Sequence, residues 1–167
     1  MVTCIVGGNN QHYHFNDKEV NELSNKLIEI KKNNADIELN IITSRRTSNL
    51  IKKILIKKLG NIATIWTGDG QNPYEKSIQS SSFFIVTSDS TSMISEAAIS
   101  GKPIYIYHLA FKRKSKRIEN FHMEFSGLGI TKNIINVKHL GNWTYNPLNE
   151  SERIARIIKK RIIEEKL

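Results

Sequence analysis

The feature that most constrains the fold of this chain is a regular alternation of short apolar runs with amphipathic stretches. The apolar runs have the length of strands and few charges; they cover residues 2–6, 37–43, 62–66, 83–86 and 104–107. In the stretches between them, apolar residues recur at helical spacing. Strands of this kind that alternate with amphipathic helices indicate a parallel sheet covered on both faces. We therefore predict a doubly wound α/β domain with about five to six strands and helices on both faces.

Local signals place the ends of several elements. Asp17 is positioned to cap the first helix. A helix over about residues 93–99 would end near Gly101, because glycine accepts the left-handed geometry at a helix C-terminus. Pro103 then opens the fifth strand at a position where a missing N–H matters least. After that strand the pattern weakens into a basic, helix-like stretch over about residues 111–125.

The length and the composition indicate one globular domain. Of the 167 residues, 39% are hydrophobic and 25% are charged, which supports neither a disordered nor a membrane-spanning chain. An irregular region around Trp143 and Pro147 leads to a last basic amphipathic helix that starts at Asn149 or Ser151. No linker divides the chain, so we expect residues 1–167 to form a single domain.

The sequence also predicts where the protein resides. The longest apolar runs are far below the roughly 20 residues that cross a bilayer. The first residues lack the basic and apolar regions of a secretory signal. The single cysteine, Cys4, has no partner for an internal disulfide, which fits a reducing compartment. We expect a cytoplasmic protein, with peripheral contact to a membrane surface left open.

The charge balance predicts an anionic partner without naming it. The formal net charge is +9 and the pI is about 9.7. Such a balance attracts nucleic acid, a phosphate-bearing ligand or an anionic membrane surface alike. The sequence has no RNP-type aromatic motif and no helix-turn-helix signature, so no nucleic-acid partner is expected.

Ligands of an open parallel sheet bind beyond the carboxyl ends of its strands, so the loops that follow the strands form the candidate site. The first strand ends in Gly7, Gly8 and Asn9. Glycines there let backbone N–H groups approach an anion closely. The same pair of glycines also suits an ordinary turn.

The loop after the second strand places two arginines at a helix start. Ser44 and Thr47 flank Arg45 and Arg46. A helix N-terminus favours anions, and the charge of paired arginines opposes its dipole unless an anion is present. Either a ligand phosphate or a nearby carboxylate of the protein can supply that anion.

The loop after the third strand joins an aromatic residue, two glycines and an Asn-Pro turn between Trp66 and Tyr74. A short helix through about residue 80 follows. The loop, which includes Asn72, can shape a pocket for a base or merely reverse the chain. Asp69 within it has the character of a turn former more than of an acid catalyst.

The loop after the fourth strand is the most specific of the set. It is rich in hydroxyls and offers donors to a pyrophosphate at a helix N-terminus; it consists of Ser88, Asp89, Ser90, Thr91 and Ser92. Glu96 follows about one and a half turns further along the helix. A carboxylate there can accept hydrogen bonds from both hydroxyls of a ribose. The alternative is an ordinary capped helix with an exposed glutamate.

None of the five histidines has an Asp or Cys arrangement that indicates a triad or a metal site. His122 is the candidate for an acid/base role, because histidine transfers protons near neutral pH. No metal site and no permanently bound cofactor are predicted.

Taken in order, these segments resemble a known family. The stretch SDSTSMISEAAISGKPIYIY is similar to the donor-binding region in the C-terminal domain of GT-B-type glycosyltransferases and sugar-nucleotide 2-epimerases. With GGNN, ITSRRT, the pattern W-x-G-x-G-x-NPY and the later FH, the chain more closely resembles the mitochondrial-fission-protein family of plants and its bacterial relatives, described as nucleoside-diphosphate-sugar epimerase-like. The matches run from Gly7 to His122 in the expected order.

The resemblance implies a Rossmann-like domain of the GT-B C-terminal type and a role for each matching position. Glu96 would hold the ribose, residues 88–92 would meet the diphosphate, and Arg45 and Arg46 would neutralise its charge. The other implied positions border the sugar phosphate or line the cleft: Gly7, Gly8, Asn9, Tyr74 and Lys102. Full members carry a further Rossmann-like half before this one, so the resemblance also implies a partner half that completes the cleft.

Two functions follow from these observations. The first is a domain that binds a nucleoside diphosphate sugar within a GT-B-like glycosyltransferase or an epimerase-like protein; the chain alone is expected to bind its ligand more than to catalyse a complete reaction. The second is a non-catalytic scaffold or membrane-associated factor that retains the fold, suggested by the basic face and the terminal amphipathic helix.

Overall fold

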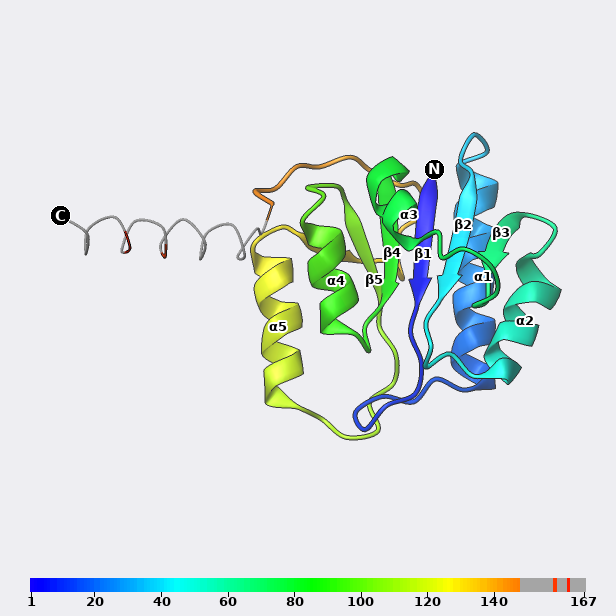
Figure 1. The fold of residues 1–167 in the computed structure, drawn as a ribbon, viewed down its shortest axis with the longest axis horizontal. Helices are drawn as coiled ribbons and strands as arrows, with labels where there is room; N and C mark the ends of the chain where they lie inside the picture. The colour runs from blue at the N-terminus through cyan, green and yellow to red at the C-terminus, as the bar shows by residue number, and fades with distance from the viewer. Residues whose placement is uncertain (148–157, 159–161, 163–167) are drawn as a thin grey trace.

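The computed structural model describes residues 1–147, 158 and 162 and shows an open parallel sheet with helices on both faces (Figure 1). In this part of the chain, the strands are β1 (Val2–Val6), β2 (Leu39–Thr43), β3 (Ala63–Trp66), β4 (Phe83–Thr87), β5 (Ile104–Tyr107) and β6 (Thr131–Asn133). They form one sheet in the order β3-β2-β1-β4-β5-β6, and every pair of neighbours is parallel. The order reverses between β1 and β4, which confirms the predicted doubly wound α/β fold.

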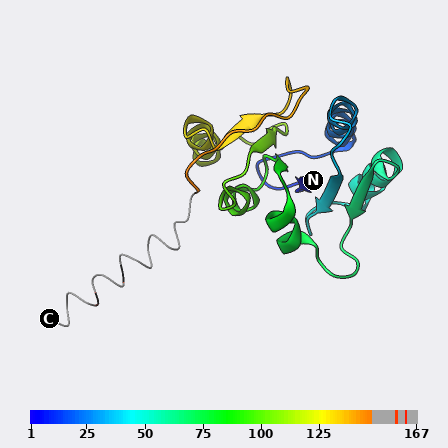
Figure 2. The ribbon, with the colours of Figure 1, turned by 90° about the horizontal axis from the view of Figure 1, so that it is seen from above.

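The helices alternate with the strands and cover both faces of the sheet. They are α1 (Asp17–Asn33), α2 (Asn49–Leu59), α3 (Tyr74–Ser80), α4 (Thr91–Ala98) and α5 (Lys116–Gly127). Figure 2 shows α1 and α2, in blue and teal, on one side of the sheet and α3 and α4, in green, on the other. Each face therefore has its own hydrophobic core.

The side chains of β1 divide between the two cores because successive residues of a strand point to opposite faces. Cys4 and Val6 pack in the core under α1 and α2, whereas Ile5 packs in the core under α4 and α5. All five residues of β1 are buried. A central strand buried on both faces has the near-continuous apolar sequence by which it was predicted.

The N-cap of helix α1 lies one residue earlier than the predicted cap, Asp17. Asn16 is the N-cap: its side chain accepts the Lys18 N–H at 2.9 Å, and the Glu19 carboxylate accepts the Asn16 N–H at 3.1 Å. Asp17 is the first helical residue and contributes only its negative charge to the first turn. The predicted capping role of Asp17 is therefore wrong, because the capping box needs its two members three residues apart.

The helix α5 starts later than predicted, at Lys116. The preceding segment is held by the loop that follows β1: the His14 N–H donates to the Ala110 carbonyl at 3.0 Å, and the Lys112 N–H donates to the His12 carbonyl at 2.8 Å. The rings of Tyr13 and Phe111 stack with their centroids 4.7 Å apart. Backbone groups that bond to this loop cannot form helical hydrogen bonds, so the helix begins only after its N-cap, Ser115.

The other predicted boundaries differ by one or two residues. The helix α4 covers residues 91–98, against the predicted 93–99, and Gly101 has the expected left-handed φ of 69°. The sixth strand, β6, lies between the predicted helical stretch and the region around Trp143, within the predicted five to six strands, and it pairs with β5. Beyond it, Trp143 packs edge-on against Tyr105 with ring centroids 5.0 Å apart. The predicted last helix, from Asn149 or Ser151, lies outside the described residues apart from 158 and 162.

Candidate functional site

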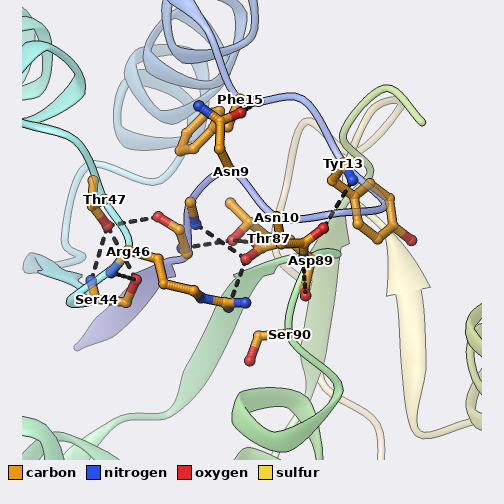
Figure 3. Close-up of polar contacts among 12 residues, drawn as sticks. Asn9, Asn10, Tyr13, Phe15, Ser44, Arg46, Thr47, Thr87, Asp89 and Ser90 are labelled. Atoms are coloured by element: carbon orange, nitrogen blue, oxygen red, sulfur yellow. Dashed lines mark hydrogen bonds and ion pairs between the residues drawn. The ribbon is translucent and has the colours of Figure 1, made fainter. Parts of the chain in front are cut away.

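The loops that follow β1, β2 and β4 meet at the carboxyl edge of the sheet, where the strand order reverses (Figure 3). The Asp89 carboxylate lies at their centre and its side chain is 0% exposed. It accepts the Thr87 hydroxyl at 2.7 Å and the Gly8 N–H at 3.1 Å. The Arg46 guanidinium lies 2.8 Å from the same carboxylate. One side chain therefore joins three strand-end loops.

A second set of hydrogen bonds closes the network around this carboxylate. The Gly7 N–H donates to the Thr87 hydroxyl at 2.8 Å. The Thr47 hydroxyl donates to the Gly7 carbonyl at 2.6 Å and accepts the Ser44 N–H at 3.0 Å. The Asn10 side chain donates to the Asp89 carbonyl at 3.0 Å. Most polar groups of the loop after β1 thus have hydrogen-bond partners within the protein.

Both glycines of the first loop are required by close approach of the chain. A Cβ on Gly7 would overlap the Asp89 carboxylate, and a Cβ on Gly8 would overlap the backbone carbonyl of Arg46. The overlaps lie inside the 3.0 Å that real Cβ atoms keep from other atoms. The glycine pair is therefore explained by the packing of protein against protein.

The side chains of the next residues shape the loop itself. The Asn9 side chain accepts the Phe15 N–H at 2.6 Å. The Asn10 side chain accepts the N–H groups of His12 and Tyr13 at 2.8 and 2.9 Å. Asparagine commonly stabilises turns in this way.

Opposing effects act on the pKa of Asp89. Burial raises the pKa of this carboxyl, whereas the hydrogen bonds from Thr87 and Gly8 and the charge of Arg46 lower it. The ion pair with Arg46 requires the ionised form. Burial is the larger effect, so the pKa of Asp89 is raised above its usual value and the three donors offset only part of the loss of solvent around the carboxylate.

A cleft of about 470 Å³ opens beside this network, between the loops after β2 and β3 and the helix α4. Its floor is formed by Ile5, Ile42 and Thr43, at the ends of β1 and β2. Its walls are formed by Ser44, Arg45, Lys52, Trp66, Thr67, Gly68, Asn72, Tyr74, Met93 and Glu96. The cleft thus combines aromatic surface, two cations and one carboxylate.

The carboxylate of the cleft is oriented by a tyrosine. The Tyr74 hydroxyl donates to Glu96 at 2.7 Å, across the space between α3 and α4. Burial raises the pKa of Tyr74, and the hydrogen bond to Glu96 raises it further. Glu96 itself is exposed, so its carboxylate can accept bonds from a ligand as well. Asn72 accepts the Tyr74 N–H at 3.0 Å and so positions the start of α3.

The start of α4 lies between the cleft and the Asp89 network. Ser90 is the N-cap of α4, but its side chain makes no capping hydrogen bond; its hydroxyl lies 3.2 Å from that of Ser92. Thr91 is half-buried and Ser92 is exposed. In contrast, Ser88 is fully buried, and its hydroxyl accepts the Leu109 N–H at 3.0 Å. The Ser88 side chain therefore stabilises the fold by bonding to the backbone after β5.

The histidine predicted for acid/base chemistry lies apart from the cleft, on α5. The Nε2 atom of His122 is 3.0 Å from the Ser88 carbonyl, and its ring packs edge-on to His108 with centroids 5.2 Å apart. Burial lowers the pKa of His122, although the bond to Ser88 raises it. Burial and the neighbouring His122 lower the pKa of His108 to about 4. Within the described residues, no cluster of His, Cys, Asp or Glu could hold a metal ion.

Most of the predicted site residues fall into two groups, and those at the start of α4 lie between the two. Those in the wall of the cleft are Ser44, Arg45, Asn72, Tyr74 and Glu96. Those in the loop network are Gly7, Gly8, Asn9, Arg46, Thr47 and Asp89. Thr87, which was not among the predicted site residues, joins them because it accepts the Gly7 N–H and donates to Asp89. Lys102 belongs to neither, because its ammonium donates to backbone carbonyls at the end of α3. Contact of these residues with a ligand stays a prediction.

Sequence reasoning missed Lys52 and Met93 as residues of the cleft wall. Lys52 lies in the first turn of α2, and Met93 lies in the first turn of α4. Both follow a strand-end loop directly, and side chains in such a first turn can reach the carboxyl edge of the sheet. Their positions just after strand-end loops could have identified them as candidates for the cleft wall, whereas their residue types could not.

The sheet order defines a Rossmann-like α/β domain, and the fold it shares with solved sugar-nucleotide epimerases agrees with the predicted GT-B type. A putative UDP-N-acetylglucosamine 2-epimerase from Listeria monocytogenes superposes with a TM-score of 0.56 at 13% identity, over 82% of this chain and 34% of that chain. A UDP-GlcNAc 2-epimerase from Neisseria meningitidis, solved bound to UDP-GlcNAc, gives a TM-score of 0.50 at 16% identity, over 99% and 37% of the two chains. At such identities the likeness shows the fold.

The chain belongs to the mitochondrial fission ELM1 family, whose profile matches residues 1–162. The protein RP120 of Rickettsia prowazekii, described as uncharacterized, is 34% identical over 168 aligned residues that cover 95% of this chain and 46% of that protein. The mitochondrial fission protein ELM1 of Arabidopsis thaliana is 24% identical over 97% of this chain and 38% of its own length. The chain thus spans less than half of these two relatives. The resemblance drawn from the sequence motifs is confirmed.

One finding bears on the expected location. In residues 1–147, no helix combines the length and the apolar character needed to span a membrane.

Proposed function

We propose that the cleft binds a nucleoside diphosphate sugar. The observation that carries this proposal is the pairing of an exposed carboxylate, Glu96, with two cations, Arg45 and Lys52, in one cleft at the carboxyl edge of a parallel sheet. A ligand that carries both a diol and a diphosphate matches that arrangement of charge. The 2-epimerase from Neisseria that shares the fold was solved with such a ligand.

Glu96 is the proposed partner of the ribose. Carboxylates near the phosphate turn of related folds accept hydrogen bonds from ribose hydroxyls. The hydrogen bond from Tyr74 occupies one oxygen of Glu96 and limits its rotation, so the second oxygen can face the cleft. A carboxylate held in advance loses less conformational entropy when the ligand binds.

The diphosphate is proposed to lie at the start of α4. The helix has no side-chain cap, so the N–H groups of its first turn are available to an anion. The hydroxyls of Ser90, Thr91 and Ser92 add donors there. Arg45 and Lys52 face the same cleft and would compensate for the charge of the ligand.

The loop after β3 is proposed to hold the base. Trp66, Thr67 and Gly68 line the cleft, and the Trp66 indole N–H donates to the Asp69 carbonyl at 2.7 Å, which orients its ring. Aromatic faces bind bases through stacking. Gly68 has a positive φ of 117°, a backbone conformation that glycine adopts without strain.

The chain is proposed to act together with a second Rossmann-like half. It spans less than half of its curated relatives and about a third of the two epimerase chains. Glycosyl transfer and epimerase-type elimination both break the bond to the diphosphate. In either reaction this domain would stabilise the charge that develops on the leaving group.

A second candidate function is contact with an anionic membrane surface. Residues 112–117 hold five lysines and arginines, all exposed, beside the half-exposed ring of Phe111. The backbone bonds to His12 hold this segment in place. Basic side chains around an aromatic ring suit a membrane interface. Co-sedimentation with anionic vesicles that no nucleotide alters, together with absence of nucleotide binding, would favour this function over the first.

Titration with UDP, GDP, ADP and CMP, followed by thermal shift and calorimetry, tests the first proposal. A site at a hundred times its dissociation constant stabilises the fold by about 2.7 kcal/mol, which raises the Tm by roughly 5–11 °C for a domain of this size. We expect Glu96→Gln to weaken binding about 10- to 100-fold, because a hydrogen bond to a charged group is lost.

Arg45→Ala should also weaken binding, while leaving the Tm of the free protein nearly unchanged. Glu124→Gln is the matched control, because Glu124 is exposed on α5 and does not line the cleft. Absence of binding by every nucleotide at millimolar concentration contradicts the proposal. Equal affinities of Glu96→Gln and Glu124→Gln contradict the role of Glu96.

A further inference from the structure

The donors around Asp89 form an anion site that is already filled. A glycine N–H, a hydroxyl and a guanidinium converge on one carboxylate, at distances of 3.1, 2.7 and 2.8 Å. Donors of these kinds hold phosphate groups at the glycine turns of nucleotide-binding folds. Here the charge they surround belongs to the protein (Figure 3).

We propose that Asp89 is a built-in anion that occupies the phosphate position of the Gly7-Gly8 turn and closes this turn to ligands. The ligand diphosphate is then confined to the start of α4 and to the cations of the cleft wall. The placement of the diphosphate rests on the proposed function, whereas the role of Asp89 as a built-in anion does not.

The loop after β1 is inaccessible to a ligand group, because its glycines and the Asp89 side chain are buried. The Asp89 side chain is 0% exposed, and Gly7 and Gly8 are buried. The Gly7 N–H is used by the Thr87 hydroxyl, and the Gly8 N–H by Asp89. Even a single added carbon at Gly7 would overlap the carboxylate. A phosphate could enter only by displacing Asp89.

Arg45 and Arg46 differ in their ion-pair partners, and this difference gives them different roles. Arg46 pairs with Asp89, and the pair is neutral. Arg45 faces the cleft, where the structure gives it no carboxylate partner among the described residues. Arg46 is thus a positioning residue for the loops, and Arg45 is the one of the two that can meet a ligand anion.

Chemical rescue tests the built-in anion. Asp89→Gly removes the carboxylate and leaves the three donors facing an empty site of carboxylate size. We expect sodium formate, compared with sodium chloride at equal ionic strength, to raise the Tm of this variant by about 3–6 °C at ten times the dissociation constant. The wild type should show no difference between the two salts.

Asp69→Gly is the matched control, because Asp69 is an exposed carboxylate in the loop after β3. It should show no formate effect. Equal formate effects in Asp89→Gly, Asp69→Gly and the wild type would overturn the proposal.

A double-mutant cycle keeps the proposal testable if Asp89→Gly does not fold. Asp89→Asn keeps the shape of the side chain and removes its charge. Arg46→Met should lower the Tm in the wild type but much less in Asp89→Asn, because the ion pair is already absent. Additive losses of Tm would overturn the pairing on which the built-in anion depends.

The two proposals fail separately. Formate rescue without nucleotide binding by the wild type refutes the proposed function and leaves the built-in anion intact. Nucleotide binding without formate rescue or coupling refutes the built-in anion alone.

Discussion

Replacement of Gly7 by alanine should destabilise the protein through one specific contact. The added Cβ would overlap both oxygens of the Asp89 carboxylate. Overpacking costs about 1–3 kcal/mol, and displacement of the carboxylate weakens charge-assisted hydrogen bonds worth about 1.5–3 kcal/mol each. The lower entropy of the unfolded alanine chain offsets about 0.4–1 kcal/mol of this. We expect a net loss of about 3 kcal/mol in the free energy of unfolding, or roughly 6–12 °C in Tm.

The assay is urea denaturation of four proteins: the wild type, Gly7→Ala, Asp89→Gly and the double variant. Because the overlap is with the Asp89 side chain, Gly7→Ala should cost far less in the Asp89→Gly background. Gly8→Ala is the control, since its Cβ would meet the backbone carbonyl of Arg46, which Asp89→Gly leaves in place. A Gly7→Ala loss that is the same in both backgrounds, or no loss at all, refutes the reasoning.

Three further predictions concern the caps, the loop network and the histidines. Asn16→Ala should lower the free energy of unfolding by about 1 kcal/mol in chemical denaturation, and an equal or larger loss for Asp17→Ala would contradict the assigned cap. Thr47→Val should lower the free energy of unfolding by about 1–3 kcal/mol in the same assay, because the Gly7 carbonyl and the Ser44 N–H lose their partner; a free energy of unfolding equal to that of the wild type would contradict this. Folding lowers the pKa of His108 from 6.5 to about 4 and also lowers that of His122. The unfolded chain then binds more protons in this window, so stability should fall as the pH drops from about 6.5 towards 4. His108→Gln should flatten the decline in a pH series of Tm values, and an unchanged slope would contradict the assignment.

Much of the fold follows from short-range pattern. The apolar run of β1 and the helical spacing of Val20, Leu23 and Leu27 were sufficient to predict a central strand and a covering helix, and all these side chains are buried. Periodicity has this power because burial on one or two faces decides which positions must be apolar. The strand-end loops were also predictable, since a parallel sheet brings its carboxyl ends to one edge.

Local signals were weaker where two neighbouring residues suit the same role. Asn16 and Asp17 are both good caps, and the choice between them depends on the reach of Glu19 back to the N-cap N–H. The start of α5 depends on contacts of a loop about a hundred residues earlier in the chain, among them the bond of Lys112 to His12. No local pattern contains that information.

The loop that contains Arg45 and Arg46 shows the same difference between what local sequence predicts and what distant contacts decide. From sequence, an anion was expected near Arg45 and Arg46, and it could be a ligand or a carboxylate of the protein. The tertiary structure decided between these for Arg46, because the loops after β1, β2 and β4 place Asp89 within 2.8 Å of its guanidinium.

The sequence by itself thus determined the parallel α/β architecture, the edge at which the candidate site lies and the family. Only the tertiary structure decided which polar residues of the strand-end loops satisfy one another and which, such as Arg45 and Glu96, remain in the wall of a cleft. The reason is physical: hydrophobic periodicity is a property of neighbouring residues, whereas a buried carboxylate takes its partners from wherever the folded chain brings donors together.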